Sequence, residues 1–255
     1  MEKSHIEAAV AKYCSAHGYD RLSVRAAMFD MDGVLFDSMK NHAYSWHETM
    51  KHFGFDLPEW EAYMHEGRTG AGTINIVSNR ERGHDATEEE IASIYKYKSD
   101  LFSTRPTAPR MPGSYELLTK VKECGVTPLV VTGSGQVTLL ERLNRNFPNI
   151  FCKDLMVTAF DVKYGKPNPE PYLMGMEKMK AVSKESLSEN NFIVVENAPL
   201  GVQAGVAAGV FTIAVNTGPL PDDALLSQGA NILFHSMQEF CDNWEMVAEV
   251  LGVVE

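Results

Sequence analysis

Short apolar runs alternate with helical segments through most of this chain, and this alternation restricts the fold more than any other feature. Strands that alternate with helices predict a parallel sheet whose two faces are covered by helices. We therefore predict an α/β protein with a doubly wound, Rossmann-like core, in which ligands gather where the strands end. The predicted strands are residues 24–29, 128–131, 155–158, 192–195 and 211–215, and the predicted helices include residues 114–124, a segment with Val137, Leu140 and Leu143, and residues 199–209.

The first apolar run leads into Asp30-Met31-Asp32-Gly33. Strand periodicity puts Asp30 and Asp32 on the same side of the chain, where two carboxylates repel unless a cation offsets their charge. Magnesium suits such oxygen ligands, and a carboxylate beside it can attack a phosphate while the second carboxylate does acid/base work. Gly33 has no Cβ, so the chain can turn sharply and bring backbone amides close to an anion. Taken alone, these four residues also fit an ordinary acidic turn.

Polar residues also follow the later runs. Thr132 and Ser134 come directly after residues 128–131 and offer hydroxyls and turn amides to a phosphate, although Thr-Gly-Ser-Gly alone is equally an ordinary turn. Lys166 lies in a proline-rich loop, where its ammonium can counter the aspartates and a phosphoryl group. A surface lysine in such a turn is the alternative. Asn168 and Pro169 are predicted to cap and begin the next helix.

The run at residues 192–195 is followed by Glu196 and Asn197. Both side chains carry oxygen donors of the kind that a magnesium ion takes, directly or through water. Small residues dominate the helix at residues 199–209, so we expect it to lie close against the sheet. A structural role alone would explain those small residues.

Residues 37–108 carry a helical pattern and are predicted to form a small cap domain inserted after the aspartate loop. The core would then comprise residues 1–36 and 109–255. We expect Asp37 or Ser38 to cap the first cap helix and a capping box to start at Thr87. Pro58 suits the first turn of the second helix, residues 64–72 read as a glycine-rich connection, and the prolines of residues 105–113 mark the return to the core.

Residues 1–20 show one apolar helical face that ends at Gly18, which predicts an added helix packed on the core, with a dimer contact as the alternative. The net charge of −11 argues against nucleic acid or an anionic membrane as a partner. The four cysteines have no paired spacing, which favours a reducing cytoplasm over a disulfide framework. We find no signal peptide and no span long enough to cross a membrane.

The order of these motifs resembles the haloacid dehalogenase superfamily, specifically its phosphatase and phosphomutase branch with a helical cap. The likeness rests on Asp30-Met31-Asp32-Gly33-Val34, on Gly165-Lys166-Pro167 and on the stretch from Glu196 to Gly209, and it covers nearly the whole chain beyond residue 20. The resemblance implies a nucleophile at Asp30, a general acid/base at Asp32, a phosphoryl ligand at Thr132 and a charge clamp at Lys166. It also implies a Mg²⁺ site formed by Asp30, Asp32, Glu196 and Asn197.

Within that branch the chain is most similar to β-phosphoglucomutase and sugar-phosphate phosphatases, which implies substrate contacts from Ser38, His42 and Lys98. Two positions depart from the pattern. Gly70 stands where the mutases carry an arginine for the second phosphate, and Arg68 is the candidate substitute. Asn197 stands where an aspartate is common, and Glu66 in the cap is an acidic side chain that can compensate when the cap closes. A solvated loop glutamate is the alternative for Glu66.

The leading hypothesis is magnesium-dependent phosphoryl transfer through an aspartyl-phosphate on a small phosphorylated metabolite. A sugar phosphate handled in the β-phosphoglucomutase manner is the first choice of substrate, and pyrophosphate hydrolysis is the second. A phosphate-binding module without catalysis is the hypothesis from another class. We expect a monomer or a weak homodimer. The histidines at 42, 47, 52 and 65 do not share one helical face with an acid between them, which disfavours a zinc site.

Overall fold

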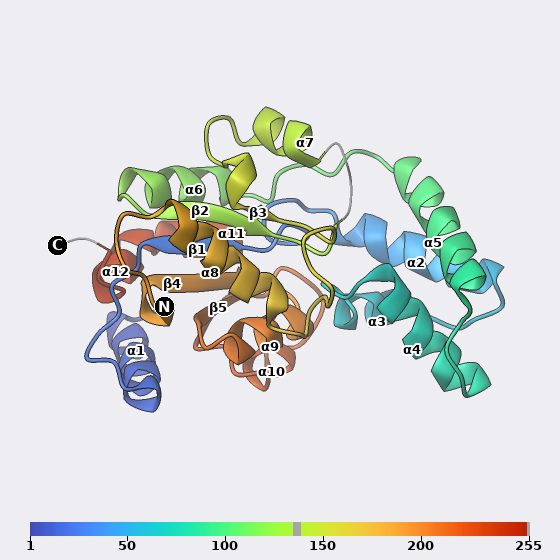
Figure 1. Ribbon diagram of the computed structural model, residues 1–255, viewed down its shortest axis with the longest axis horizontal. Coiled ribbons are helices and arrows are strands. Elements are labelled where there is room, and N and C mark those ends of the chain that lie inside the picture. The colour runs from blue at the N-terminus through green and yellow to red at the C-terminus, as the bar shows by residue number, and fades with distance from the viewer. Residues whose placement is uncertain (135–138, 254–255) are drawn as a thin grey trace.

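The computed structural model describes residues 1–134 and 139–253, and its core is one parallel sheet of six strands (Figure 1). The predicted α/β core is confirmed. The strand order is β3-β2-β1-β4-β5-β6, with the first strand at the centre. The strands are β1 (Ala26–Phe29), β2 (Thr127–Val131), β3 (Met156–Val157), β4 (Phe192–Glu196), β5 (Phe211–Val215) and β6 (Ile232–Phe234). The sequence reading missed β6, because three apolar residues are too short a run to stand out.

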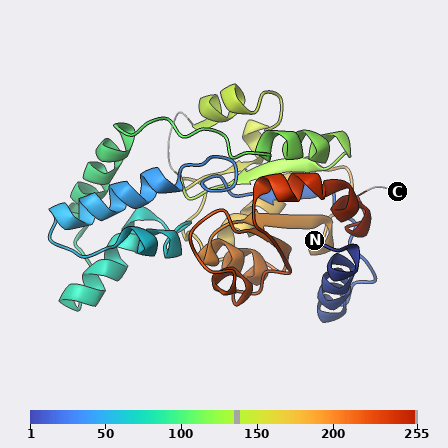
Figure 2. The same ribbon diagram turned by 180° about the vertical axis from the view of Figure 1, so that it is seen from behind.

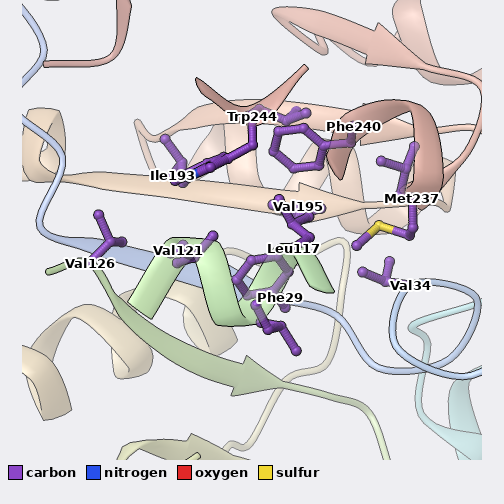
Figure 3. Packing of buried hydrophobic residues seen from close by; sticks show 14 of the residues in the cluster. Phe29, Val34, Leu117, Val121, Val126, Ile193, Val195, Met237, Phe240 and Trp244 are labelled. Carbon is purple, nitrogen blue, oxygen red and sulfur yellow. The ribbon is translucent and has the colours of Figure 1, made fainter. Parts of the chain in front are cut away.

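Helices cover both faces of the sheet, as predicted. Successive residues of β1 point to opposite faces, so Phe29 joins one apolar cluster and Met28 the other. Figure 3 shows the first cluster, in which Leu117, Phe240 and Trp244 lie with Phe29. The core helices are α6 (Ser114–Glu123), α7 (Leu139–Asn146), α8 (Glu170–Val182), α9 (Pro199–Ala207), α10 (Asp223–Leu226), α11 (Met237–Asp242) and α12 (Trp244–Val250), with short 3-10 turns η1 (Lys153–Leu155) and η2 (Glu189–Asn191).

Helix α7 covers part of a segment predicted from three apolar residues. Val137 and the side chain of Leu140 lie outside the described residues, whereas Leu143 is fully buried in the core. Pro169 takes the N-cap position of α8, one residue later than predicted. The side chain of Asn168 nevertheless accepts a hydrogen bond from the Glu170 amide at 2.9 Å, so it still satisfies a free donor of the first turn.

Four helices follow β1 before the chain returns to the sheet, and in Figures 1 and 2 they lie beyond the carboxyl ends of the strands. They are α2 (Met39–His52), α3 (Glu59–Met64), α4 (Gly70–Arg82) and α5 (Glu88–Ser103). They share an apolar cluster that includes Met50, Ile74 and Ile94 and is separate from the clusters of the sheet. We call this group the cap and keep its limits at residues 37–108 as a prediction.

Of the predictions for individual residues at the helix ends of the cap, one is confirmed and others are wrong. The capping box at Thr87 is confirmed, with both reciprocal hydrogen bonds to Glu90. Ser38 is the N-cap residue of α2, but its hydroxyl makes no cap hydrogen bond and donates to Asp32 instead. Pro58 is the N-cap residue of α3 and not part of its first turn. Gly70 begins α4, so the connection between α3 and α4 is shorter than predicted.

The predicted N-terminal helix is α1 (Lys3–His17), which ends at Gly18 in the left-handed conformation. Tyr13 attaches it to the core: its hydroxyl donates to the Gly209 carbonyl at 2.6 Å and its ring meets Phe211 edge-on. Ile6 is fully buried in the same cluster, so the helix packs on the core as expected. Figure 2 places it at the end of the molecule opposite the cap. In the part of the chain that the structure describes, no helix has the length and apolar character needed to cross a membrane.

Gly205 explains why α9 lies so close to the sheet. A Cβ at this position would stand 2.7 Å from the hydroxyl of Thr212 and 3.0 Å from a methyl of Val194, and both neighbours are fully buried. We expect Gly205→Ala to lower the free energy of unfolding by about 1 kcal/mol, because overpacking costs about 1–3 kcal/mol and alanine regains only about 0.5–1 kcal/mol in a helix. Urea denaturation checks this value. Gln203→Ala on the exposed side of α9 is the control, and a stabilised Gly205→Ala variant would contradict the close packing.

Candidate active site

The carboxyl ends of three neighbouring strands bring the predicted site residues together. Phe29 at the end of β1 is in register with Val130 of β2 and Val195 of β4. The next residues along these strands therefore meet at one edge of the sheet, and they lead to Asp30, Thr132 and Glu196. All three are buried. The parallel register alone explains why residues more than 160 positions apart in sequence share one site.

Lys166 is the positive charge at the centre of this edge. Its Nζ lies 2.5 Å from Oδ1 of Asp30, 2.6 Å from Oε1 of Glu196 and 3.0 Å from the Val131 carbonyl. The residue is only 2% exposed, so the alternative of a surface lysine is wrong. Burial would lower the pKa of Lys166, but the two carboxylates outweigh it and raise that pKa, so the ammonium is charged.

The surroundings of Asp30 hold more negative charge than one lysine offsets. Burial raises the pKa of Asp30 to about 8; the charge of Lys166 opposes this rise and the charges of Glu196 and Asp32 add to it. Glu196 is held in place by Lys166 and by the Tyr172 hydroxyl, which donates to the same oxygen at 2.6 Å. The site is therefore short of positive charge when Asp30 is ionised.

Asp32 is stabilised as a carboxylate by two cap residues. Ser38 Oγ donates to its Oδ1 at 2.5 Å, and His42 Nε2 lies 3.4 Å from the same oxygen. Burial opposes ionisation of Asp32, but the interactions with His42 and Ser38 outweigh it and lower the pKa. Since burial and Lys98 lower the pKa of His42, we attribute the effect to hydrogen bonding more than to a full imidazolium charge. The two aspartates thus have opposite pKa shifts.

Lys98 completes this chain of contacts from the cap. Its Nζ lies 3.0 Å from Nδ1 of His42 and stands over the rings of Trp46 and Phe102. The side chain is 6% exposed, and burial lowers its pKa to about 8. Ser38 is fully buried behind Asp32, so the structure brings it to that aspartate and not to the cavity surface.

Glu66 reaches the core from the loop between α3 and α4. Its Oε2 accepts a hydrogen bond from Nδ2 of Asn197 at 2.9 Å, and its Oε1 is out of contact with solvent. Burial raises the pKa of Glu66 well above its usual value, and the charges of Asp30, Glu196 and Asp32 raise it further. The alternative of a solvated loop glutamate is therefore wrong. Within the described residues, Oε1 of Glu66 and Oδ1 of Asn197 are buried oxygens without a hydrogen-bond donor.

These unpaired oxygens are suitable ligands for a divalent cation. No group of three or more His, Cys, Asp or Glu side chains forms a metal centre among the described residues. Asp30 and Glu196 point toward Lys166 and not toward a shared metal position. Asn197 is not one of the four residue types in that group, although its amide oxygen can bind a metal ion. Mg²⁺ commonly uses one or two carboxylates and keeps several waters. The negative surroundings of Asp30 and two buried oxygens without donors therefore fit such an ion.

A cavity of about 800 Å³ opens between the cap and the ends of the strands. It is lined by most of the predicted site residues: Asp30, Asp32, His42, Glu66, Arg68, Lys98, Thr132 and Ser134. Gly33 lines a smaller cavity of about 170 Å³ with Asn197. Its φ is 88°, and a Cβ there would stand on the Asn197 side chain, so Gly33 makes room for the amide.

Comparisons with known proteins agree with this geometry. The family model described as haloacid dehalogenase-like hydrolase matches residues 27–215. The chain belongs to this family. A Bacteroides vulgatus structure described as a "putative beta-phosphoglucomutase" is 62% identical, with a TM-score of 0.93, and the match covers 98% of this chain and 99% of that one. The resemblance inferred from the motifs, and with it an enzyme of the phosphatase and phosphomutase kind, is confirmed.

Two curated relatives of this haloacid dehalogenase-like hydrolase are named as a phosphatase and a phosphohydrolase. Hexitol phosphatase A of Escherichia coli is 29% identical over 213 residues, which cover 83% of this chain and 91% of that protein. Glycerol-1-phosphate phosphohydrolase 2 of Saccharomyces cerevisiae is 30% identical over 224 residues, which cover 83% of this chain and 82% of that protein. The family match and these relatives cover the cap as well as the core.

Tyr95, Arg105 and Arg142 are among the residues that line the main cavity and that the sequence did not indicate as site residues. Tyr95 and the two arginines belong to no sequence motif. A Cβ on Gly70 would lie 2.3 Å from the ring of Tyr95. The ring therefore fills the space that a side chain at position 70 would need. This pairing has no sequence signal, because α4 and α5 must pack before the two residues meet.

The pKa of Lys98 predicts the alkaline limb of the activity profile. Because that pKa is lowered to about 8, the ammonium is present below pH 8 and is lost above it, and with it an attraction for a phosphate substrate. We expect kcat/KM for p-nitrophenyl phosphate to fall through pH 8 in the natural enzyme. Lys98→Arg keeps the positive charge and should move this limb to higher pH.

Lys96→Met is the matched control for this pH profile, since Lys96 lies on the same helix and is exposed in an ion pair with Asp100. Its profile should equal that of the natural enzyme. An alkaline limb that stays at pH 8 in Lys98→Arg would assign the titration to another group.

Proposed function

We propose that this protein hydrolyses pyrophosphate with Mg²⁺, through an aspartyl-phosphate on Asp30. The observation that carries the proposal is Glu66, whose buried carboxylate enters the reaction centre from the cap and accepts a hydrogen bond from Asn197. A carboxylate in this position repels the anionic part of a substrate unless a cation lies between them. A metal complex of a small, highly charged phosphate meets this condition.

The residues at the strand ends have distinct tasks in the reaction. Asp30 attacks phosphorus, with Lys166 and Thr132 beside the phosphoryl oxygens. Asp32 is ionised in the free site, and the negative charge of the bound substrate raises its pKa so that it holds the proton that it gives to the leaving oxygen; it then takes a proton from the attacking water. Asp30, Asn197 and Glu66, with Asp32 and Glu196 close by, would hold Mg²⁺, which supplies positive charge to the phosphoryl group and favours the ionised form of Asp30. The cap limits access of bulk water while the phosphoryl-enzyme exists.

The mutase reading loses support at position 70. A mutase must hold the second phosphate group of its bisphosphate intermediate, and Gly70 stands where the resemblance implies an arginine for that group; Arg68, the candidate substitute, lines the same cavity from a different position. The ring of Tyr95 fills the space that a side chain at position 70 would need. Losing a charge-assisted clamp would weaken such an intermediate by about 1.5–3 kcal/mol. Pyrophosphate hydrolysis needs no reorientation of an intermediate.

Sugar-phosphate hydrolysis or β-phosphoglucomutase activity is the second candidate. Two observations favour it: the relatives named above act on phosphorylated polyols, and the cavity of about 800 Å³ is larger than pyrophosphate requires. A phosphate-binding module without catalysis has the least support, because both aspartates and Lys166 are present in one buried site.

Substrate choice is tested with Glu66. We expect the natural enzyme with Mg²⁺ to release phosphate from pyrophosphate far faster than it converts β-glucose 1-phosphate to glucose 6-phosphate. Glu66→Ala removes a cap carboxylate from the reaction centre and should lower kcat/KM for pyrophosphate by about 10–100-fold, the range seen when a group supporting a metal site is lost. Phosphate release and a coupled glucose 6-phosphate assay measure the two activities.

Glu59→Gln is the control for this substitution, because Glu59 belongs to the neighbouring helix α3 and is exposed. It should leave both activities unchanged. Mutase turnover that exceeds pyrophosphate hydrolysis would refute the proposed substrate and return the first choice to a sugar phosphate.

The covalent intermediate is tested by trapping phosphorylation at Asp30. We expect acid quenching of the natural enzyme during turnover of phosphorus-32 pyrophosphate with Mg²⁺ to leave label on the peptide that contains Asp30, because the phosphoryl group is bonded to the Asp30 carboxylate before water attacks the phosphorus. Hydroxylamine, which cleaves acyl phosphates, should release this label. Asp30→Asn lacks the nucleophile and should carry no label, and a natural enzyme that turns over without any labelled peptide would contradict the scheme.

A further inference from the structure

Arg142 is a cation in the main cavity that the reaction scheme has not used. It comes from α7, on the core side of the cavity, and its guanidinium stands 3.8 Å over the ring of Phe36. Among the described residues it makes no salt bridge, and its buried Nε has no hydrogen-bond acceptor. An aromatic ring holds the side chain, while its donors stay available.

The surroundings of Arg142 indicate what those donors are for. Buried donors in folded proteins are almost always satisfied, so a buried Nε without an acceptor beside a cavity indicates an acceptor that arrives with a ligand. Arg68 and Arg105 line the same cavity with an Nε in the same state. Its planar fork of donors matches phosphate oxygens. Arg142 and Asp32 line the same cavity. Burial lowers the pKa of Arg142, and the charge of Asp32 opposes this lowering. The ligand group bound by Arg142 therefore lies on the side of the site where Asp32 protonates the leaving oxygen.

We propose that Arg142 binds the leaving phosphate of the substrate. This inference rests on the proposed pyrophosphate hydrolysis and names a specificity residue within it. A carboxylate oxygen of Asp30 forms the new bond to phosphorus. The bond from phosphorus to the bridging oxygen breaks, and its electron pair stays on that oxygen, which takes the proton of Asp32. The phosphate so released has its remaining oxygens on the guanidinium of Arg142.

A structural role for Arg142 makes a different prediction. If the side chain only packs on Phe36 or tunes Asp32, its loss should affect every substrate alike, because all of them use the same nucleophile and the same acid. A leaving-group ligand should matter only for substrates whose leaving group is a phosphate. The dependence on the leaving group therefore separates the two roles.

The experiment compares pyrophosphate with p-nitrophenyl phosphate in Arg142→Ala, Arg142→Lys and the natural enzyme. We expect Arg142→Ala to lower kcat/KM for pyrophosphate by about 10–100-fold, the range for a lost charge-assisted hydrogen bond, and to change that for p-nitrophenyl phosphate less than about threefold. Arg142→Lys keeps the charge without the planar fork of donors, so its kcat/KM for pyrophosphate should lie between the values of the natural enzyme and Arg142→Ala. Added guanidinium should restore pyrophosphate hydrolysis in Arg142→Ala.

Arg145→Ala is the matched control, since Arg145 is exposed on the same helix. It should leave both rates unchanged, and thermal unfolding of each variant verifies that it is folded. Equal losses on both substrates, or no loss on pyrophosphate, would overturn the inference. A natural enzyme that does not hydrolyse pyrophosphate would refute the proposed function. A binding measurement then tests the proposed role of Arg142 separately.

That measurement uses methylenediphosphonate and methylphosphonate, which differ by one phosphonate group and are not hydrolysed. Calorimetry with Mg²⁺ should give tighter binding of the diphosphonate by the natural enzyme, and Arg142→Ala should remove most of the difference. A natural enzyme that binds both compounds equally, or a variant that keeps the full difference, would overturn the second-phosphate site whatever the substrate is.

Discussion

The buried contact of Lys166 with Asp30 and Glu196 is the interaction on which the site depends. It joins the ends of β1 and β4 to the loop before α8, at distances of 2.5 and 2.6 Å. Removing one partner from a buried ion pair typically costs about 3–5 kcal/mol, because the remaining charge is left without compensation. The lysine therefore has two effects: it offsets the cost of burying two carboxylates, and it holds Asp30, the proposed nucleophile, in one orientation.

One lysine does not balance this much acid. Asp30, Asp32, Glu66 and Glu196 all converge on the same edge, and burial together with the remaining repulsion raises the pKa values of Asp30 and Glu66. Glu66 adds to the imbalance only because the cap brings it there. A cation that enters with an anionic substrate would relieve the repulsion and favour the closed arrangement, so the charge of the site links metal binding, substrate binding and the position of the cap.

The core was predictable from sequence because its signals are local. Each long apolar run became a strand, and the polar residue after it fell at the strand end, as with Asp30 and Glu196. The misses depend on packing between distant segments. The Ser38 hydroxyl donates to Asp32 and does not cap its helix. The Tyr95 ring fills the space beside Gly70, and Arg142 reaches the cavity from a helix that carries no motif. The β6 strand is too short for a periodic signal. No spacing in the sequence encodes these contacts.

The opposite pKa shifts of the two aspartates follow from their different surroundings. Asp30 lies in the core, where burial and the charges of Glu196 and Asp32 raise its pKa more than Lys166 lowers it. Burial also opposes ionisation of Asp32, but His42 and Ser38 of the cap outweigh it and lower the pKa. Withdrawing the cap would remove both partners from Asp32, and the shift of its pKa should then shrink. The cap therefore acts on the proposed acid/base, whereas the core sets the protonation of the proposed nucleophile, and proton transfer is tied to the enclosed substrate through Asp32.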